Sequence, residues 1–215
     1  MAKTVVVKIG SKVLANDAGD LDARSVKRVR RQLAKLQQRC NVVVLVSGAV
    51  QFGKKLFANK QAAAAWGQVR LMQAFGNVGQ MLLCKNDLKE VLVRKSLLKT
   101  IEDFWQQGLV VLINENDVVE MNSFGGNDFL ALEMARLVDA KEIVLMSNVD
   151  GLLDKQKQVV GMVRSVNQDI WDLVDDQNAS GVGGMKAKIE VAKMCLQEGR
   201  KLTITNGRTE GTVFV

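Results

Sequence analysis

Short apolar runs that alternate with longer helical stretches are the feature that most restricts the fold of this chain. TVVVKI at Thr4–Ile9 and VVVLV at 42–46 are rich in β-branched residues and end at polar or glycine residues, as buried strands do. Between them, Val26, Val29 and Leu33 recur at helical spacing. Strands that are apolar on both faces and separated by helices are typical of parallel sheets. The pattern therefore predicts an α/β fold with a mostly parallel sheet covered by helices on both faces.

The same alternation continues to the end of the chain. Strands are expected at residues 4–9, 42–46, 79–84, 109–113, 142–146 and 201–205, with an additional edge strand at 159–166. Helices are expected at residues 21–38, 60–75, 87–107, 128–138 and 184–198, and two of them stop at Gly108 and Gly199. No linker, repeat or low-complexity segment divides the sequence, so we expect a single domain over residues 1–215.

Composition narrows the chemistry that the chain can perform. It contains no histidine and no tyrosine, which excludes a Ser-His-Asp triad and any imidazole base. Its three cysteines are far apart and have no metal-binding spacing, so we predict no metal site built from protein side chains. No apolar run approaches the roughly 18 residues of a membrane span. We therefore expect a cytoplasmic protein without membrane contact.

The chain has a surplus of positive charge, with 30 Lys and Arg against 23 Asp and Glu and a formal net charge of +7. The basic residues are scattered apart from residues 27–31, and aromatic residues make up only 5%. A nucleic-acid-binding surface more often shows a basic stripe with interleaved aromatics. A solvated surface explains the surplus most simply, and a phosphate-bearing small substrate suits it at least as well as nucleic acid. We therefore predict no nucleic-acid partner.

Polar and glycine-rich segments follow the predicted strands, where parallel α/β proteins bind their ligands. Lys8 is either exposed on an edge strand or an ammonium group held beside Gly10 to meet a phosphate. Ser47-Gly48-Ala49 is either a plain strand-to-helix turn or an anion seat at a helix N-terminus. Spacing alone does not separate these alternatives.

Three further segments allow the same two interpretations. INEND at 113–117 is a turn, or a set of amides and carboxylates that binds the amine and carboxylate of an amino acid. GGND at 125–128 is a glycine loop before a helix, or a site in which Asp128 positions lysines. GVGGMKAK at 181–188 is a flexible loop before a solvated helix, or a backbone anion nest followed by cations. The chain has no GxxxxGK[ST] phosphate-binding loop.

Together and in this order, these segments resemble the glutamate 5-kinase branch of the amino acid kinase family. The matching segments are VVVKIGS, VSGAV, VGQMLL, LINEND, GGNDFLAL, LMSNVDGL and GVGGMKAK, which run nearly end to end. The resemblance implies the amino acid kinase (carbamate kinase-like) fold, a three-layer αβα sandwich. It also implies phosphorylation of the side-chain carboxylate of L-glutamate by ATP with Mg²⁺, giving glutamyl 5-phosphate in the first step of proline biosynthesis. We further expect a homo-oligomer.

The resemblance also assigns roles to individual residues. Lys8 and Lys188 would flank the transferred phosphoryl group and Asp128 would orient both lysines, which makes these three the expected catalytic residues. Gly10 and Gly48 would donate backbone N–H groups to phosphate. The expected nucleotide site comprises Lys8, Gly10, Ser11, Gly48, Ser147, Asn148, Gly183, Gly184, Met185 and Lys188. The expected glutamate site comprises Ser47, Gly48, Ala49, Asn114, Asp117 and Asn127.

The chain also departs from the family pattern. Gly126 and Asn148 stand where the family usually has aspartate, and the segment between Phe75 and Val78 is shorter than usual. We expect no PUA domain of the kind that full-length relatives often carry. These departures leave two alternatives open. One is an enzyme of the same fold with another carboxylate, carbamate or phosphate acceptor, and the other is a non-catalytic regulator that binds a nucleotide or an amino acid.

Overall fold

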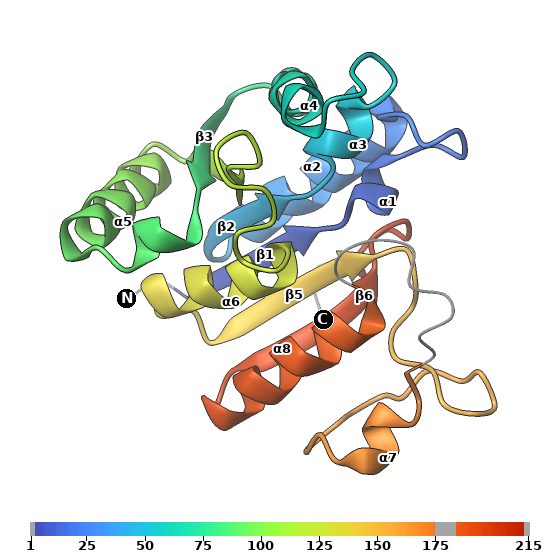
Figure 1. Ribbon diagram of the computed structural model, residues 1–215. Coiled ribbons are helices and arrows are strands. Elements are labelled where there is room, and N and C mark those ends of the chain that lie inside the picture. The colour runs from blue at the N-terminus through green and yellow to red at the C-terminus, as the bar shows by residue number, and fades with distance from the viewer. Residues whose placement is uncertain (1–2, 175–183, 213–215) are drawn as a thin grey trace.

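A six-stranded sheet forms the centre of the computed structural model, which describes residues 3–174 and 184–212 (Figure 1). The strand order is β3-β4-β2-β1-β5-β6, and all five pairings between neighbouring strands are parallel. The predicted parallel α/β fold is therefore confirmed. The strands are β1 (Thr4–Ile9), β2 (Asn41–Val46), β3 (Val78–Leu83), β4 (Val110–Glu115), β5 (Glu142–Ser147) and β6 (Lys201–Asn206).

Helices cover both faces of this sheet, which confirms the three-layer sandwich. One face packs against α1 (Ser11–Leu14), α2 (Ala23–Gln37), α3 (Ala49–Gly53) and α4 (Lys60–Phe75). The other packs against the 3₁₀ helix η1 (Lys85–Leu88), α5 (Val91–Gln106), α6 (Asn127–Leu137) and α8 (Met185–Gln197). The short helix α7 (Gln168–Trp171) lies apart from the sheet in Figure 1. None of the helices in the described part of the chain combines the length and apolar character needed to cross a bilayer.

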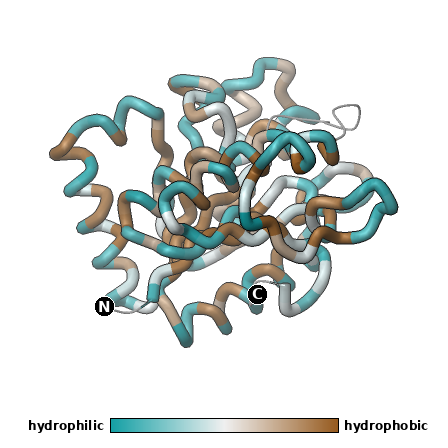
Figure 2. Tube along the Cα trace, turned by 90° about the horizontal axis from the view of Figure 1, so that it is seen from below, coloured by the Kyte–Doolittle hydropathy of each residue, from teal (hydrophilic) through white to brown (hydrophobic). Residues whose placement is uncertain are grey.

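The apolar runs of the sequence form the core because both faces of each central strand are covered. In β1, Val5 and Val7 pack toward α2, while Val6 packs toward the layer that contains α6 and α8. Val6 and Val7 are completely buried, and each such valine stabilises the fold by about 1.5–3 kcal/mol relative to an exposed one. In Figure 2 hydrophobic segments gather in the middle of the molecule and hydrophilic ones lie at outer loops.

The structure differs from the sequence prediction in three places. β4 continues through Asn114 and Glu115, whereas the strand was expected to end at Ile113, because both side chains are buried. The helix expected at 87–107 begins only at Val91, since Asp87 accepts the N–H of Cys84 at 2.7 Å and closes a separate 3₁₀ turn. The edge strand expected at 159–166 is wrong, because an isolated bridge to Leu153 is its only β pairing within the described residues.

The helices α3 and α4 cross with their backbones in direct contact. A Cβ atom on Gly67 would lie 1.8 Å from the carbonyl oxygen of Ala49, and one on Gly53 would lie 1.9 Å from that of Ala63. Only glycine allows so close an approach. The crossing holds α4 against the sheet with the side chain of Gln68 buried.

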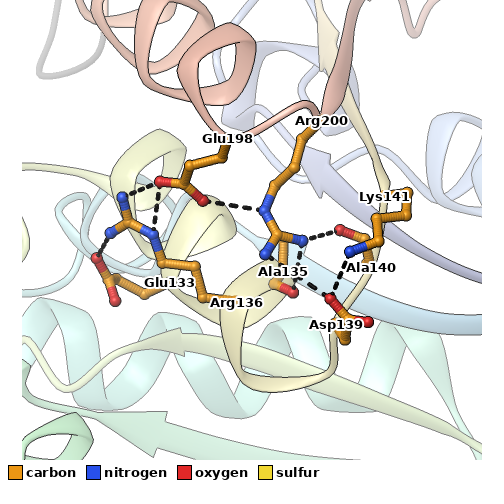
Figure 3. A network of polar contacts seen from close by, with 8 residues as sticks. All are labelled: Glu133, Ala135, Arg136, Asp139, Ala140, Lys141, Glu198 and Arg200. Atoms are coloured by element: carbon orange, nitrogen blue, oxygen red, sulfur yellow. Dashed lines mark hydrogen bonds and ion pairs between the residues drawn. The ribbon is translucent and has the colours of Figure 1, made fainter.

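A polar network ties the C-terminal ends of α6 and α8 together (Figure 3). The Arg200 guanidinium donates to the carbonyl oxygens of Ala135 and Ala140, which lie at the end of α6. Its Nε also donates to Glu198 at 3.0 Å, and Arg136 donates to the same carboxylate. Because the Arg200 side chain is only 10% exposed, these bonds are poorly screened by water. The network fixes the two helices that carry Asp128 and Lys188.

Replacement of this arginine should measure what the network contributes. We expect Arg200→Met to lower the free energy of unfolding by about 1–3 kcal/mol, because two carbonyls lose this donor and the Glu198 carboxylate keeps only Arg136. Lys141→Met is the matched control, since Lys141 forms a largely exposed ion pair with Asp139 and should change stability little. Urea denaturation of the two variants compares them. An equal loss of stability in Arg200→Met and Lys141→Met would contradict a special role for Arg200.

Candidate active site

Two lysines share one buried carboxylate at the carboxyl end of the sheet. Lys8 Nζ on β1 lies 2.8 Å from Asp128 Oδ1, and Lys188 Nζ on α8 lies 2.8 Å from Asp128 Oδ2. The side chains of Lys8, Asp128 and Lys188 are only 10%, 1% and 9% exposed. Lys8 is therefore not an exposed residue of an edge strand, because β1 lies inside the sheet between β2 and β5. The three residues, here called the lysine–aspartate triad, come from segments 60 or more residues apart.

The triad carries one more positive than negative charge. Burial favours the neutral form of Asp128, but the two ammonium groups outweigh it and hold the pKa of Asp128 below its ordinary value. Burial lowers the pKa of Lys188, and nearby Lys8 lowers it further, while Asp128 opposes both effects. Two ammonium groups held at fixed positions in a poorly hydrated place can also stabilise an anion that comes close. The electrostatics thus suit a phosphoryl group.

Amide side chains form a second cluster directly beside the triad. Asn127, the neighbour of Asp128, donates through Nδ2 to Ser47 Oγ at 2.9 Å and to Asn114 Oδ1 at 2.7 Å. Asn114 Nδ2 in turn donates to Gln68 Oε1 at 3.1 Å. Among the described residues, buried Asn127 Oδ1 and Gln68 Nε2 have no hydrogen-bond partner. One acceptor and one donor are thus left for a ligand, since unpaired buried polar atoms are costly.

A cavity of about 250 Å³ opens next to this amide cluster. Burial raises the pKa of two carboxylates that line it, those of Glu115 and Asp117. Glu115 accepts the N–H of Phe124 at 2.9 Å, and Asp117 accepts that of Asn122 at 3.3 Å. The two acids therefore shape the loop between β4 and α6. The cavity is lined by Ala49, Ala64, Ala65, Gln68, Val69, Gln80, Leu82, Glu115, Asp117 and Val118.

The loops that follow β1 and β2 lie in contact at this edge. Gly48 has a φ of 119°, and a Cβ there would lie 2.5 Å from the Phe52 ring and 3.0 Å from Ser11 Cβ, so only glycine fits. The contact expected between the Gly10 N–H and phosphate stays a prediction. That N–H donates to the Met146 carbonyl at 2.9 Å, because hydrogen bonding of the sheet continues one residue beyond β1.

The remaining expected site residues are not joined to the triad by a side-chain contact in the part of the chain that the structure describes. Ser147 ends β5, and Asn148 follows it on the surface. Gly184 is the N-cap of α8 and Met185 its first residue, one turn before Lys188. Ala49 is buried against Gly67 and also lines the 250 Å³ cavity. Gly183 lies outside the described residues.

Sequence reasoning missed two residues that the site contains. The sequence predicts Gln68 only as part of a helix, and it includes Glu115 in the INEND segment without singling it out as a site residue. The signal for Gln68 was present, because it follows Ala63, Ala64 and Gly67 on the small-residue face of α4 and is the polar member of that buried face. The signal for Glu115 was weaker, since burial of a strand end is decided by the loop that covers it.

Comparison with known proteins identifies relatives over nearly the whole chain. The sequence model of the amino acid kinase family matches residues 3–206. The chain is 34% identical to "Glutamate 5-kinase" of Syntrophus aciditrophicus, covering 99% of this chain and 62% of that protein. It is 30% identical to "Glutamate 5-kinase" of Clostridium acetobutylicum, covering 98% of this chain and 94% of that protein. Against the Syntrophus protein, the chain thus spans less than two thirds of the relative's length.

Solved structures support the fold at lower identity. UMP kinase from Ureaplasma parvum superposes with a TM-score of 0.61 at 17% identity, covering 100% of this chain and 94% of that one. N-acetylglutamate synthase from Neisseria gonorrhoeae, in complex with coenzyme A and L-arginine, gives a TM-score of 0.64 at 13% identity over 99% of this chain and 58% of that one. Identities this low bear on the fold alone.

Removal of the central carboxylate should destabilise the fold. We expect Asp128→Asn to lower the free energy of unfolding at neutral pH by about 3–5 kcal/mol, because two buried ammonium groups would face each other without a carboxylate. Asp139→Asn is the control, since Asp139 lies on the surface and its replacement should change the free energy of unfolding little. Urea denaturation measures both variants.

The pH dependence of this difference tests its cause. The folded pKa of Asp128 is below its unfolded value of about 3.9, so its contribution is complete above that value and is lost as pH falls through the folded pKa. The stability gap between the wild type and Asp128→Asn should therefore narrow as the pH is lowered below about 4. A gap that stays constant into the acid range would show that charge is not its origin.

Proposed function

The chain belongs to the amino acid kinase family, and from that premise we propose that it transfers the γ-phosphoryl group of ATP to the side-chain carboxylate of L-glutamate. The observation that carries the proposal is the pair of buried lysines that share Asp128 at 2.8 Å each. Support also comes from relatives with the name glutamate 5-kinase at 30–35% identity. The product would be glutamyl 5-phosphate, the first intermediate of proline biosynthesis.

The proposed reaction is an in-line displacement at phosphorus. A carboxylate oxygen of glutamate forms the new O–P bond, the bond between the γ-phosphorus and the β–γ bridging oxygen breaks, and ADP leaves with that electron pair. The attacking carboxylate is already ionised at neutral pH, so no general base is required. A chain without histidine is therefore equipped for this reaction.

The lysine–aspartate triad would supply the electrostatic stabilisation. Ammonium groups at Lys8 and Lys188 would offset the negative charge on the equatorial oxygens of the phosphoryl group as it moves. Asp128 touches both lysines and fixes where they stand before the substrates arrive. Asp128 is thus a positioning residue, and its own oxygens are occupied by the lysines.

Glutamate would occupy the amide cluster and the cavity beside it. The unpartnered Asn127 Oδ1 can accept from the α-ammonium group, and the unpartnered Gln68 Nε2 can donate to a carboxylate. Ser47, Asn114 and Asp117 line the same region and would complete the binding site. The proposed reaction requires the side-chain carboxylate of glutamate to point toward the triad, which lies beside this cluster because Asn127 and Asp128 are adjacent.

The nucleotide would lie toward the loops after β1, β2 and β5 and the start of α8. Ser11, Gly48, Ser147, Asn148 and the residues before Lys188 are the expected contacts. No three acidic or cysteine side chains come close enough to hold a metal ion in the described ranges 3–174 and 184–212. Mg²⁺ commonly keeps several waters and binds through substrate phosphates, so we propose that it arrives with ATP. When bound, it would offset phosphate charge.

Loss of the Lys188 ammonium group should remove most of the activity. We expect Lys188→Ala to lower the turnover number by about a thousandfold or more, the effect of removing a main electrostatic contact to the transition state. Lys193→Ala is the matched control, because Lys193 lies on the same helix and is exposed. The assay uses ATP, Mg²⁺ and L-glutamate with hydroxylamine to trap the acyl phosphate. Undiminished turnover in Lys188→Ala would refute the proposed role.

Loss of the Asn127 amide should affect glutamate more than ATP. We expect Asn127→Ala to raise the KM for L-glutamate by about tenfold or more, while the KM for ATP changes little, because hydrogen bonds to a charged ligand contribute about 1.5–3 kcal/mol. Asn86→Ala, at an exposed position of η1, is the control. A larger change in the KM for ATP than in that for glutamate would contradict this placement. A cytoplasmic location and a homo-oligomer stay predictions.

A further inference from the structure

A second and larger hollow lies at the opposite edge of the sheet. Its volume is about 630 Å³, and it lies between α2, the end of α4 and the starts of β3 and β4. We call it the α2 groove. It is lined by Ala23, Val26, Lys27, Arg30, Arg31, Leu33, Ala34, Gln37, Ala74, Phe75, Asn77, Val78, Gly108, Leu109 and Val110.

The α2 groove is separate from the lysine–aspartate triad. Val78 and Val110, the first residues of β3 and β4, lie at the groove, whereas Asn114 lies at the other end of β4. A strand rises about 3.3 Å per residue, so the four steps from Val110 to Asn114 along β4 separate the two places by roughly 13 Å. A ligand in the groove would thus not touch the phosphoryl-transfer residues.

The charged side chains that line the groove are all basic among the residues that the structure describes. They are Lys27, Arg30 and Arg31. Arg31 forms an ion pair with Glu210, while the Arg30 guanidinium lies against the turn at Gly76, where a Cβ would be 3.4 Å from Nη2. The parent helix has no acid at all and presents six basic residues: Arg24, Lys27, Arg28, Arg30, Arg31 and Lys35.

The floor of the groove is apolar. Its base consists of the buried core residues Val26, Leu33, Phe75 and Val110. Its accessible apolar surface comes from Ala34, Val78 and Leu109. The connection between α4 and β3 consists only of Gly76-Asn77, which is too short to cover the floor. An apolar hollow of 300–1,000 Å³ with a few polar groups at its rim is typical of small-molecule sites.

From the volume, the floor and the charge together, we propose that the α2 groove binds an amphipathic organic anion. Its apolar body would lie on Ala34, Val78 and Leu109, and its carboxylate, sulfonate or phosphate would pair with Lys27 and Arg30. Such pairs are charge-assisted and are strengthened where the apolar body excludes water. Charge complementarity favours an anion over a neutral or cationic ligand.

Fluorescence titration with 8-anilinonaphthalene-1-sulfonate, an amphipathic anion, tests this proposal on the whole chain. We expect saturable binding that saturating ATP, Mg²⁺ and L-glutamate do not displace. The double variant Lys27→Glu/Arg30→Glu should weaken binding by about tenfold or more, because two attractive charges become repulsive. Arg24→Glu/Lys35→Glu is the matched control, since it makes the same charge change on the same helix outside the groove lining.

A variant without charge change gives an independent test. Ala34→Phe would place a ring in the hollow and should abolish binding, because Ala34 is exposed and lines the groove. Circular dichroism checks that each variant is folded. If either Lys27→Glu/Arg30→Glu or Ala34→Phe does not fold, binding to the other one still tests the proposal. Equal weakening by both charge-reversal pairs, unchanged binding in Ala34→Phe, or displacement by the substrates would overturn the proposal. None of these outcomes depends on whether the chain phosphorylates glutamate.

Discussion

The carboxylate of Asp128, held between two buried ammonium groups, is the interaction on which the rest of the site depends. It joins the centre of the sheet, the start of α6 and the second turn of α8 within two contacts of 2.8 Å. An isolated charge at 1% exposure would be severely destabilising. The pairing therefore requires that all three elements keep their positions, and the polar network at the far ends of α6 and α8 helps to keep them there.

The same arrangement places two ammonium groups on one carboxylate. The amide cluster beside them has one buried acceptor and one buried donor that lack hydrogen-bond partners among the described residues. Both features lie at the carboxyl edge of a parallel sheet, where the loops after β1, β2 and β4 meet. An anionic phosphoryl group could pair with the ammonium groups, and a zwitterionic amino acid could pair with the amides. These features agree with the family to which the chain belongs.

The opposite edge of the sheet differs from the active-site edge in the kind of side chains that it presents. There the α2 groove combines an apolar floor with basic side chains, and its described lining residues include no buried carboxylate of the kind that Asp128 provides. Elements nonetheless connect the two places, since α4 lines the groove with Phe75 and reaches the amide cluster with Gln68. An occupant of the groove would therefore contact a helix that also belongs to the substrate region.

The sequence by itself determined the layers of this protein, because apolar runs such as Thr4–Ile9 can only be buried between two covers of helix. It also predicted helix ends at Gly108 and Gly199, where α5 and α8 stop within two residues. It did not determine the end of β4, the role of Gln68 or the use of the Gly10 N–H. Those features depend on contacts between segments that are distant in the sequence. Asn127 donates to Asn114, the Gly10 N–H donates to the Met146 carbonyl, and Lys8 and Lys188 both pair with Asp128. Only the tertiary structure decides such contacts, since pairing and burial of polar groups are set by distant residues and not by local spacing.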